Sequence, residues 1–278
     1  MSNKLNQKCM TNFEKVKEFN NALQIHTLDS LTLELFENEK QLISLFISKI
    51  NKEVQKLEDA IIDKKNDKIS NALINIIYET YSMQYRLGIK GDIEFAKHHT
   101  SHMTYLVDWF KIKYVLQPNL TNFEKVKEYN NIVNRQDLHS LTTKNKYKNR
   151  FRNALEYLSQ IKEEVYELEY AIKEKSIDDM CDTLVNIIYI MYGAQYLLGI
   201  QGDDDFDIFH KSNMSRLCYS KEEAIKTIEC RTKENIVNTQ YYAPYYFKVP
   251  EQEIWVVKNW YTGKIVNSIN YKSAKWLD

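Results

Sequence analysis

Glycine and proline are scarce in this chain, whose 278 residues include only six glycines and three prolines. Both residues interrupt regular structure, so their scarcity favours long helices. The chain also has no excess of either charge, because 38 basic residues balance 38 acidic ones. It therefore lacks the basic surplus that is typical of nucleic-acid-binding proteins, and we expect no nucleic acid partner.

Cysteines are few as well, and none forms a CxxC pair. The four are Cys9, Cys181, Cys218 and Cys230. Their spacing argues against a disulfide scaffold or a zinc site and favours a reduced, cytoplasmic protein. Residues 1–8 contain no apolar signal-peptide core. The most apolar run, Thr183–Ile200, is interrupted by Asn186 and Gln195. We therefore predict a buried bundle helix there and no membrane partner.

The sequence contains a long internal repeat. Thr11–Asn21 returns almost unchanged as Thr121–Asn131, 110 residues later. Gln84–Asp92 returns as Gln195–Asp203, 111 residues later, so one inserted residue explains the change in spacing. Two copies of a segment this long predict a tandem pair of small domains and not a solenoid.

Each copy has the same expected order of helices. Asn12 or Asn122 can cap an opening helix. In the second copy a long helix follows, then a short polar break, then a helix that starts near Ile177–Asp179 and stops at Gly199. Further helices are expected at Phe206–Met214 and from Ser220, where Glu223 completes a capping box. The long helix has apolar residues at helical spacing, namely Leu155, Leu158, Ile161, Val165, Leu168, Ala171 and Ile172.

The chain changes character from about residue 235. Pro244 excludes a regular helix through the aromatic run Tyr241–Phe247. Ile254–Val257 and Lys264–Ile269 flank a glycine-containing turn, which predicts a β-hairpin. The predicted fold class is therefore all-α. It consists of two tandem helical bundle repeats at 1–118 and 119–234, followed by a small tail with a β-hairpin at 235–278.

Acidic side chains gather on two helices of the second copy. Glu164 and Glu167 are three residues apart and share a helix face, with Glu163 beside them. Asp182 and Asn186 are four apart on the next helix. If the two helices pack together, these oxygens converge, and oxygen ligands without Cys or His suit a hard cation such as Mg²⁺. A solvated acidic helix face is the alternative interpretation.

The first copy provides an internal comparison for this acidic set. Glu163, Glu164 and Glu167 correspond to Lys52, Glu53 and Lys56, while Asp182 and Asn186 correspond to Asn71 and Asn75. Lysines at two of the ligand positions would repel a divalent cation. The apolar segments of the helical frame are nevertheless retained. We therefore predict a metal site in the second copy and none in the first.

Three motifs follow one another in the second copy. Glu163–Glu167 has the form EExxE, Asp182–Asn186 has the form DxxxD with its last Asp replaced by Asn, and His210–Arg216 reads HKSNMSR. In this order they resemble the all-α nucleoside triphosphate pyrophosphohydrolases of the MazG-like superfamily. The resemblance is greatest to the phosphoribosyl-ATP-pyrophosphohydrolase-like branch. It covers Asn122–Tyr271, and the first copy resembles a degenerate version.

The resemblance implies a hydrolase of nucleotide metabolism. Such a nucleotide pyrophosphatase cleaves the α–β phosphate bond of a nucleoside triphosphate to give a monophosphate and pyrophosphate. It implies Mg²⁺ as cofactor, with Mn²⁺ as the alternative ion. The implied metal ligands are Glu164, Glu167, Asp182 and Asn186, with Glu163, Glu164 and Glu167 as catalytic residues. The implied substrate contacts are Lys211, Asn213, Arg216 and Lys264.

Asn186 leaves a second interpretation open. Its amide oxygen can ligate Mg²⁺ but carries no negative charge. The alternative function is therefore a catalytically weakened or inactive nucleotide-binding or interaction module on the same fold. Family members assemble as dimers or tetramers, so the resemblance also implies an intramolecular pseudo-dimer of the two repeats. A further homodimer of whole chains is compatible with it.

Overall fold

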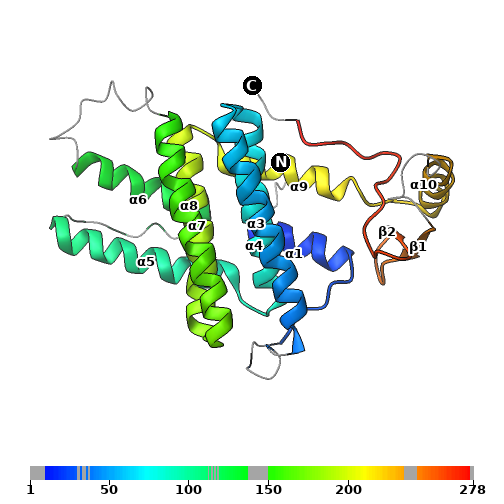
Figure 1. The fold of residues 1–278 in the computed structure, drawn as a ribbon, viewed down its shortest axis with the longest axis horizontal. Coiled ribbons are helices and arrows are strands. Elements are labelled where there is room, and N and C mark those ends of the chain that lie inside the picture. The colour runs from blue at the N-terminus through cyan, green and yellow to red at the C-terminus, as the bar shows by residue number, and fades with distance from the viewer. Residues whose placement is uncertain are drawn as a thin grey trace, which may run out of the picture. The chain divides into compact units, whose positions relative to one another are not determined.

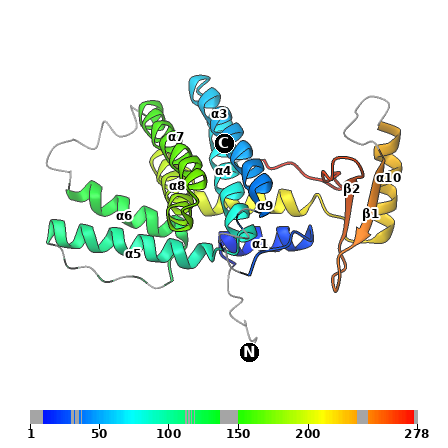
Figure 2. The same ribbon diagram turned by 60° about the horizontal axis from the view of Figure 1, so that its bottom comes forward.

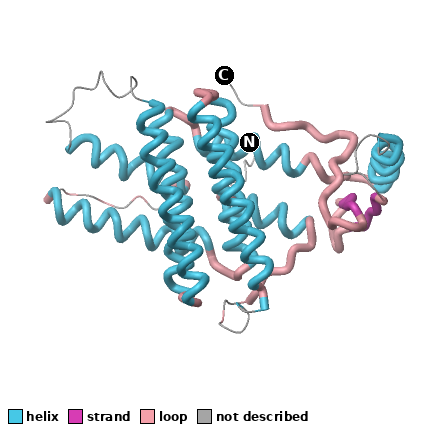
Figure 3. The backbone as a smooth tube through the Cα atoms, viewed as in Figure 1, coloured by secondary structure: helices cyan, strands magenta, loops and turns pink. Residues whose placement is uncertain are grey.

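The computed structural model is dominated by helices, and its strands lie only near the C-terminus (Figure 3). It describes residues 10–29, 32, 36, 38–111, 113, 115, 117, 119–136, 150–234 and 243–275. The helices are α1 (Asn12–Ala22), α3 (Lys40–Ile62), α4 (Asn66–Arg86), α5 (Gly91–Phe110), α6 (Asn122–Gln136), α7 (Arg150–Glu174), α8 (Ile177–Leu198), α9 (Gly202–Met214) and α10 (Lys221–Glu234). The strands are β1 (Pro244–Lys248) and β2 (Trp255–Asn259). This arrangement confirms the expected all-α class with a small hairpin.

The chain divides into two compact units that are each discontinuous in sequence. The first contains residues 1–14 and 27–205, and the second contains residues 15–26 and 206–278. The division by sequence repeat, at 118 and 234, is a separate matter and stays a prediction. Each unit is described by itself below.

Four long helices form the centre of the first unit. Helices α3 and α4 pack as one antiparallel pair and α7 and α8 as another, with further contacts between α3 and α7 and between α4 and α8 (Figure 1). Ile76 and Ile77 on α4 are fully buried, as are Ile187 and Ile188 on α8. Helices that are apolar on most sides belong at the centre of a bundle. Helices α5 and α6 lie side by side against this bundle (Figure 2).

Contacts between α3 and α7 occur in matched pairs. Asn51 donates to Glu169 over 2.9 Å, and the Lys162 ammonium lies 2.8 Å from Glu58. Lys162 and Glu169 follow Asn51 and Glu58 by 111 residues each. The two contacts therefore join equivalent positions of the two copies in both directions.

The caps of α1 and α6 differ from the prediction. Thr11 accepts from the Glu14 amide and its own amide donates to the Glu14 carboxylate, and Thr121 and Glu124 repeat this capping box. The expected cap at Asn12 or Asn122 was therefore wrong by one residue. Both asparagines are instead buried beneath the helix ends.

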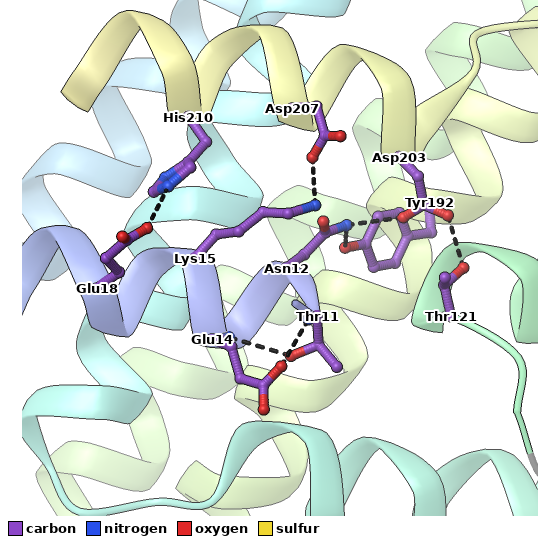
Figure 4. A network of polar contacts seen from close by, with 10 residues as sticks. All are labelled: Thr11, Asn12, Glu14, Lys15, Glu18, Thr121, Tyr192, Asp203, Asp207 and His210. Atoms are coloured by element: carbon purple, nitrogen blue, oxygen red, sulfur yellow. Dashed lines mark hydrogen bonds and ion pairs between the residues drawn. The ribbon is translucent and has the colours of Figure 1, made fainter. Parts of the chain in front are cut away.

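These two asparagines bond to the opposite copy. Asn12 donates to the Tyr192 hydroxyl over 2.8 Å and to Asp203 over 2.9 Å (Figure 4). In the matched contact, Asn122 donates to Tyr81 and Asp92, each over 2.9 Å. Because Tyr81 and Tyr192 are fully buried, their hydroxyl groups need such partners. Each opening helix is thus tied to helices of the other copy.

The ends of the later helices agree in part with the prediction. Helix α8 begins at Ile177 and Gly199 closes it with a φ of 73°, as expected of a C-cap. Helix α9 begins at Gly202 and not at Phe206. The reason is that Asp203, Asp204 and Asp205 form its first turn, where carboxylates favour the helix dipole. Of the expected apolar positions on α7, Leu155 is 50% exposed.

The C-terminal hairpin pairs different segments from those predicted. Strand β1 pairs antiparallel with β2, from Pro244 opposite Asn259 to Lys248 opposite Trp255. The predicted partner, Lys264–Ile269, makes one isolated bridge from Ile265 to Lys258. The aromatic run up to Phe247 is thus strand, although its first residues lie outside the described part. Helix α10 packs on this sheet, over a buried cluster of Cys218, Ala224, Val257 and Val266.

No single described helix is long and apolar enough to cross a membrane. Helices α8 and α9 meet the length and composition criteria only together, and they are bent by 113° at their junction. The run that we expected to be a core helix is indeed buried over most of α8.

Candidate active site

Helices α7 and α8 hold the predicted acidic residues. The two helices run antiparallel because Lys175, with a φ of 58°, and Ser176 reverse the chain between them. Ser176 caps α8 by accepting from the Asp179 amide. A Cβ at Gly193 would lie 3.1 Å from the Tyr157 ring, so glycine allows the helices to approach closely there. Seven residues later on α7 and seven residues earlier on α8, Glu164 lies beside Asn186.

Glu164 and Asn186 are the predicted pair that the structure brings together. Burial raises the pKa of the Glu164 carboxyl, and the nearby charges of Glu163 and Glu167 raise it further. A hydrogen bond from Asn186 acts in the opposite direction because it favours the carboxylate. Both side chains are half-buried. Two carboxylates thus repel the charged form of Glu164, and one amide donor stabilises it.

The other acidic residues of the set are exposed. Glu163 and Glu167 lie on the outer side of α7, and Asp182 lies on α8. Burial is the main cause that raises the pKa of the Cys181 thiol to about 11, and the charges of Asp178 and Asp182 add to the shift. Glu94 of α5 contributes to the same shift. Glu94 was not predicted as part of this region, because it lies in the first copy, far from Cys181 along the chain.

The donor set fits a hard divalent cation in its chemistry. Carboxylate and amide oxygens are the usual ligands of Mg²⁺, and a cation would relieve the repulsion around Glu164. Within the described residues, however, no group of three or more His, Cys, Asp or Glu side chains is gathered closely enough to hold a metal ion. In the described part of the chain, the carboxylates of the set thus form no closed ligand shell.

The equivalent positions of the first copy are arranged differently. The Lys56 ammonium lies 2.6 Å from Glu53, the residue that corresponds to Glu164. Asn75 donates to the backbone carbonyl of Asn71 over 2.7 Å, one turn away on α4. Lys56 thus forms an ion pair with the Glu53 carboxylate, and the side-chain amide of Asn75, which corresponds to Asn186, donates a hydrogen bond within its own helix.

The four predicted substrate contacts lie in the second unit. Lys211 is exposed on α9, and Asn213 is buried near the end of that helix. Arg216 follows α9, and its guanidinium lies 5.7 Å from the centre of the Tyr271 ring. The Arg216 Nε is buried with no hydrogen-bond partner among the described atoms. Lys264 is exposed beside the turn at Gly263.

His210 and its neighbours form ion pairs in the second unit. The His210 Nε2 lies 2.9 Å from the Glu18 carboxylate, and Lys15 pairs with Asp207 (Figure 4). Burial lowers the pKa of His210 although Glu18 counteracts the shift. These contacts join α1 to α9.

Helix α5 lies against α8 close to the acidic residues. The rings of Phe95 and Tyr189 stack with their centres 5.5 Å apart, and Phe95 meets Tyr192 edge-on at 6.1 Å. The His99 Nδ1 lies 3.3 Å from the Tyr189 hydroxyl, and its Nε2 lies 3.9 Å from Glu128. A first-copy helix therefore covers one side of the second-copy acidic helix, which periodicity alone could not reveal.

Comparison with known proteins supports the resemblance seen in the sequence. Residues 126–213 match the family model "Phosphoribosyl-ATP pyrophosphohydrolase", which confirms the MazG-like resemblance over this segment. The segment contains α7, α8 and most of α9. The chain is also 25% identical over 282 residues to "Uncharacterized protein L479" of Acanthamoeba polyphaga mimivirus, covering 100% of this chain and 99% of that relative. No solved structure matches significantly.

Proposed function

We propose that this protein is a Mg²⁺-dependent nucleoside triphosphate pyrophosphohydrolase that cleaves the α–β phosphate bond. The family match at 126–213 supports the more general conclusion that the chain contains a pyrophosphohydrolase-like domain. The observation that carries the proposal is the pairing of Glu164 with Asn186 across α7 and α8, inside that match. We place the activity in the cytoplasm, because Cys181, Cys218 and Cys230 are free thiols.

Each residue of the acidic set has a proposed role. Glu164, Glu167, Asp182 and Asn186 would hold the Mg²⁺, with Mn²⁺ as a substitute. Such an ion would supply the positive charge that the phosphate chain and an attacking water require. Glu163 would orient the attacking water from the outer side of α7. Lys211, Asn213, Arg216 and Lys264 would contact phosphate oxygens, as the resemblance implies.

The matched contacts support a pseudo-dimer within one chain. Asn12 and Asn122 each bond to a tyrosine and an aspartate that are equivalent in the two copies. Reciprocal contacts of this kind are typical of a two-fold interface between identical subunits. We propose that tandem duplication placed both subunits in one chain and that the first copy binds no metal.

Pyrophosphate release tests the enzyme directly. The full chain is incubated with each common ribo- and deoxyribonucleoside triphosphate and Mg²⁺, and the monophosphate and pyrophosphate are measured. Glu164→Gln should reduce kcat at least a hundredfold, because it removes a charged ligand. Glu156→Gln, an exposed change on the same helix, is the matched control and should leave turnover unchanged. No turnover of any nucleotide would refute the proposal.

The alternative is an inactive nucleotide-binding module on the same fold. The uncharged Asn186 favours it, together with the separation of the carboxylates in the described structure. Such a module would be stabilised thermally by nucleotide and Mg²⁺ without forming pyrophosphate. Measuring the unfolding midpoint beside the turnover assay therefore separates the two functions.

A further inference from the structure

Four aromatic rings gather where α5 crosses α8. The rings of His98 and His102, one turn apart on α5, have centres 4.1 Å apart. They meet the Tyr189 ring at 5.3 and 5.1 Å respectively. Tyr129 of α6 completes the group, 5.6 Å from His102 and 5.8 Å from Tyr189. The group thus draws on both copies, and we refer to these four residues as the ring cluster.

The ring cluster is uncharged at neutral pH. Burial lowers the pKa of His98 to about 4 and also lowers the pKa of His102. Burial raises the pKa of Tyr129, so its hydroxyl stays protonated. A cluster without charge offers little to a phosphate group, but its ring faces suit another planar, uncharged ring.

The ring cluster adjoins the acidic residues along both helices. On α8, Tyr189 lies one turn beyond Asn186 on the same face, a rise of about 4.5 Å. On α5, Glu94 lies one turn before His98, and its charge reaches Cys181 beside Asp182. On each helix a residue of the acidic region therefore comes one turn before a ring: Asn186 before Tyr189 on α8, and Glu94 before His98 on α5.

One polar atom of the ring cluster lacks a partner. The His102 Nδ1 is buried and has no hydrogen-bond partner among the described residues. A buried polar group without a partner is unfavourable, so a ligand that bonds to it gains affinity. His98, His102 and Tyr129 are each partly exposed residues, so the ring cluster is not sealed from solvent.

We propose that His98, His102, Tyr129 and Tyr189 bind the base of the nucleotide whose phosphates meet Glu164 and its neighbours. The inference rests on the proposed function and assigns the first copy a part in substrate recognition. The two histidines are particular to that copy, because Phe209 and Asn213 occupy the corresponding positions of the second. The copy that lost the acidic residues thus supplies the subsite for the base.

The test uses the full chain labelled with ¹³C on histidine rings. Nucleoside monophosphates are titrated against ribose 5-phosphate, which has the same sugar and phosphate but no base. The ring signals of His98 and His102 should shift with a monophosphate and not with ribose 5-phosphate. The signal of His26, which is exposed, should not move with either ligand. Monophosphates that leave the His98 and His102 signals in place would overturn the inference.

Variants provide the second arm of the test. His102→Phe keeps a ring and removes the nitrogen, so it should weaken monophosphate binding about tenfold and leave ribose 5-phosphate binding within twofold. His26→Phe is the control and should change neither affinity. An unchanged monophosphate affinity in a folded His102→Phe chain would also overturn the inference. Since this readout needs binding and not turnover, an inactive chain with a working ring cluster would refute only the proposed enzyme.

Discussion

Replacing Asn186 by Asp should make the protein less stable without Mg²⁺ and more responsive to it. The substitution removes the amide that donates to Glu164 and places a second carboxylate against it. Two charges 4 Å apart repel by about 1 kcal/mol in water and about 4 kcal/mol at an effective dielectric constant of 20. Because Glu164 is half-buried, we expect a loss of about 2 kcal/mol in the free energy of unfolding.

Mg²⁺ should reverse that loss. A charged carboxylate is a stronger Mg²⁺ ligand than an amide, so the variant should bind the ion more tightly. Saturation at a hundred times the Kd adds about 2.7 kcal/mol of stability. Urea unfolding, followed by circular dichroism over a series of Mg²⁺ concentrations, measures both effects on the same samples.

Asn75→Asp is the matched control in the first copy. It also introduces a carboxylate on the bundle helix, but there Lys56 already pairs with Glu53. We therefore expect a smaller loss and no added response to Mg²⁺. If Asn186→Asp and Asn75→Asp respond equally to Mg²⁺, the argument for a cation between α7 and α8 fails.

Three further predictions concern stability. The free energy of unfolding should decrease as the pH falls from 6.5 towards 4. Burial lowers the pKa of His98 and of His99 to about 4, so the unfolded chain binds protons at a higher pH than the folded chain does. Thermal unfolding at several pH values measures this dependence, which His98→Phe should reduce. Asn12→Ala and Asn122→Ala should each cost about 1–3 kcal/mol in urea unfolding, since each removes the amide donor to a buried tyrosine hydroxyl and one of the two donors to an aspartate, which keeps its threonine donor. A large difference between the two losses would contradict the matched roles. Glu223→Ala should release the C-terminal tail, because Glu223 accepts hydrogen bonds from Tyr219, Ser268 and Asn270. Limited proteolysis should then cleave the chain after residue 267. The control variant Glu222→Ala should not cause this cleavage.

Local patterns predicted the helices of this fold well. Helix α8 could be placed because its apolar periodicity and terminal Gly199 lie close together in the sequence, whereas its Ser176 cap was not predicted. The pairing of Glu164 with Asn186 was likewise foreseeable, because a short turn forces α7 and α8 together. Features set by near neighbours in the chain are those that a sequence reveals.

Features set by distant residues were missed. Thr11 and Asn12 are both good capping residues, and only the partners of Asn12 near Tyr192 decide which one caps. The strand partner of β2 was misjudged because two β-prone segments flank it and packing against α10 selects one. The ring cluster joins α5, α6 and α8, so no sequence window contains it.

The reciprocal asparagine bonds have a consequence for how the chain can change over time. In a homodimer each substitution enters both active sites at once, so a lysine at a ligand position would abolish all activity. With both halves in one chain, Lys52 and Lys56 stand at the positions equivalent to Glu163 and Glu167, and the site that we propose in the second half keeps its carboxylates. Asn12 and Asn122, with their tyrosine and aspartate partners, have no such freedom, because a loss in one half breaks the support of the other. Substitutions that alter one half alone are therefore expected only at positions that do not take part in these hydrogen bonds.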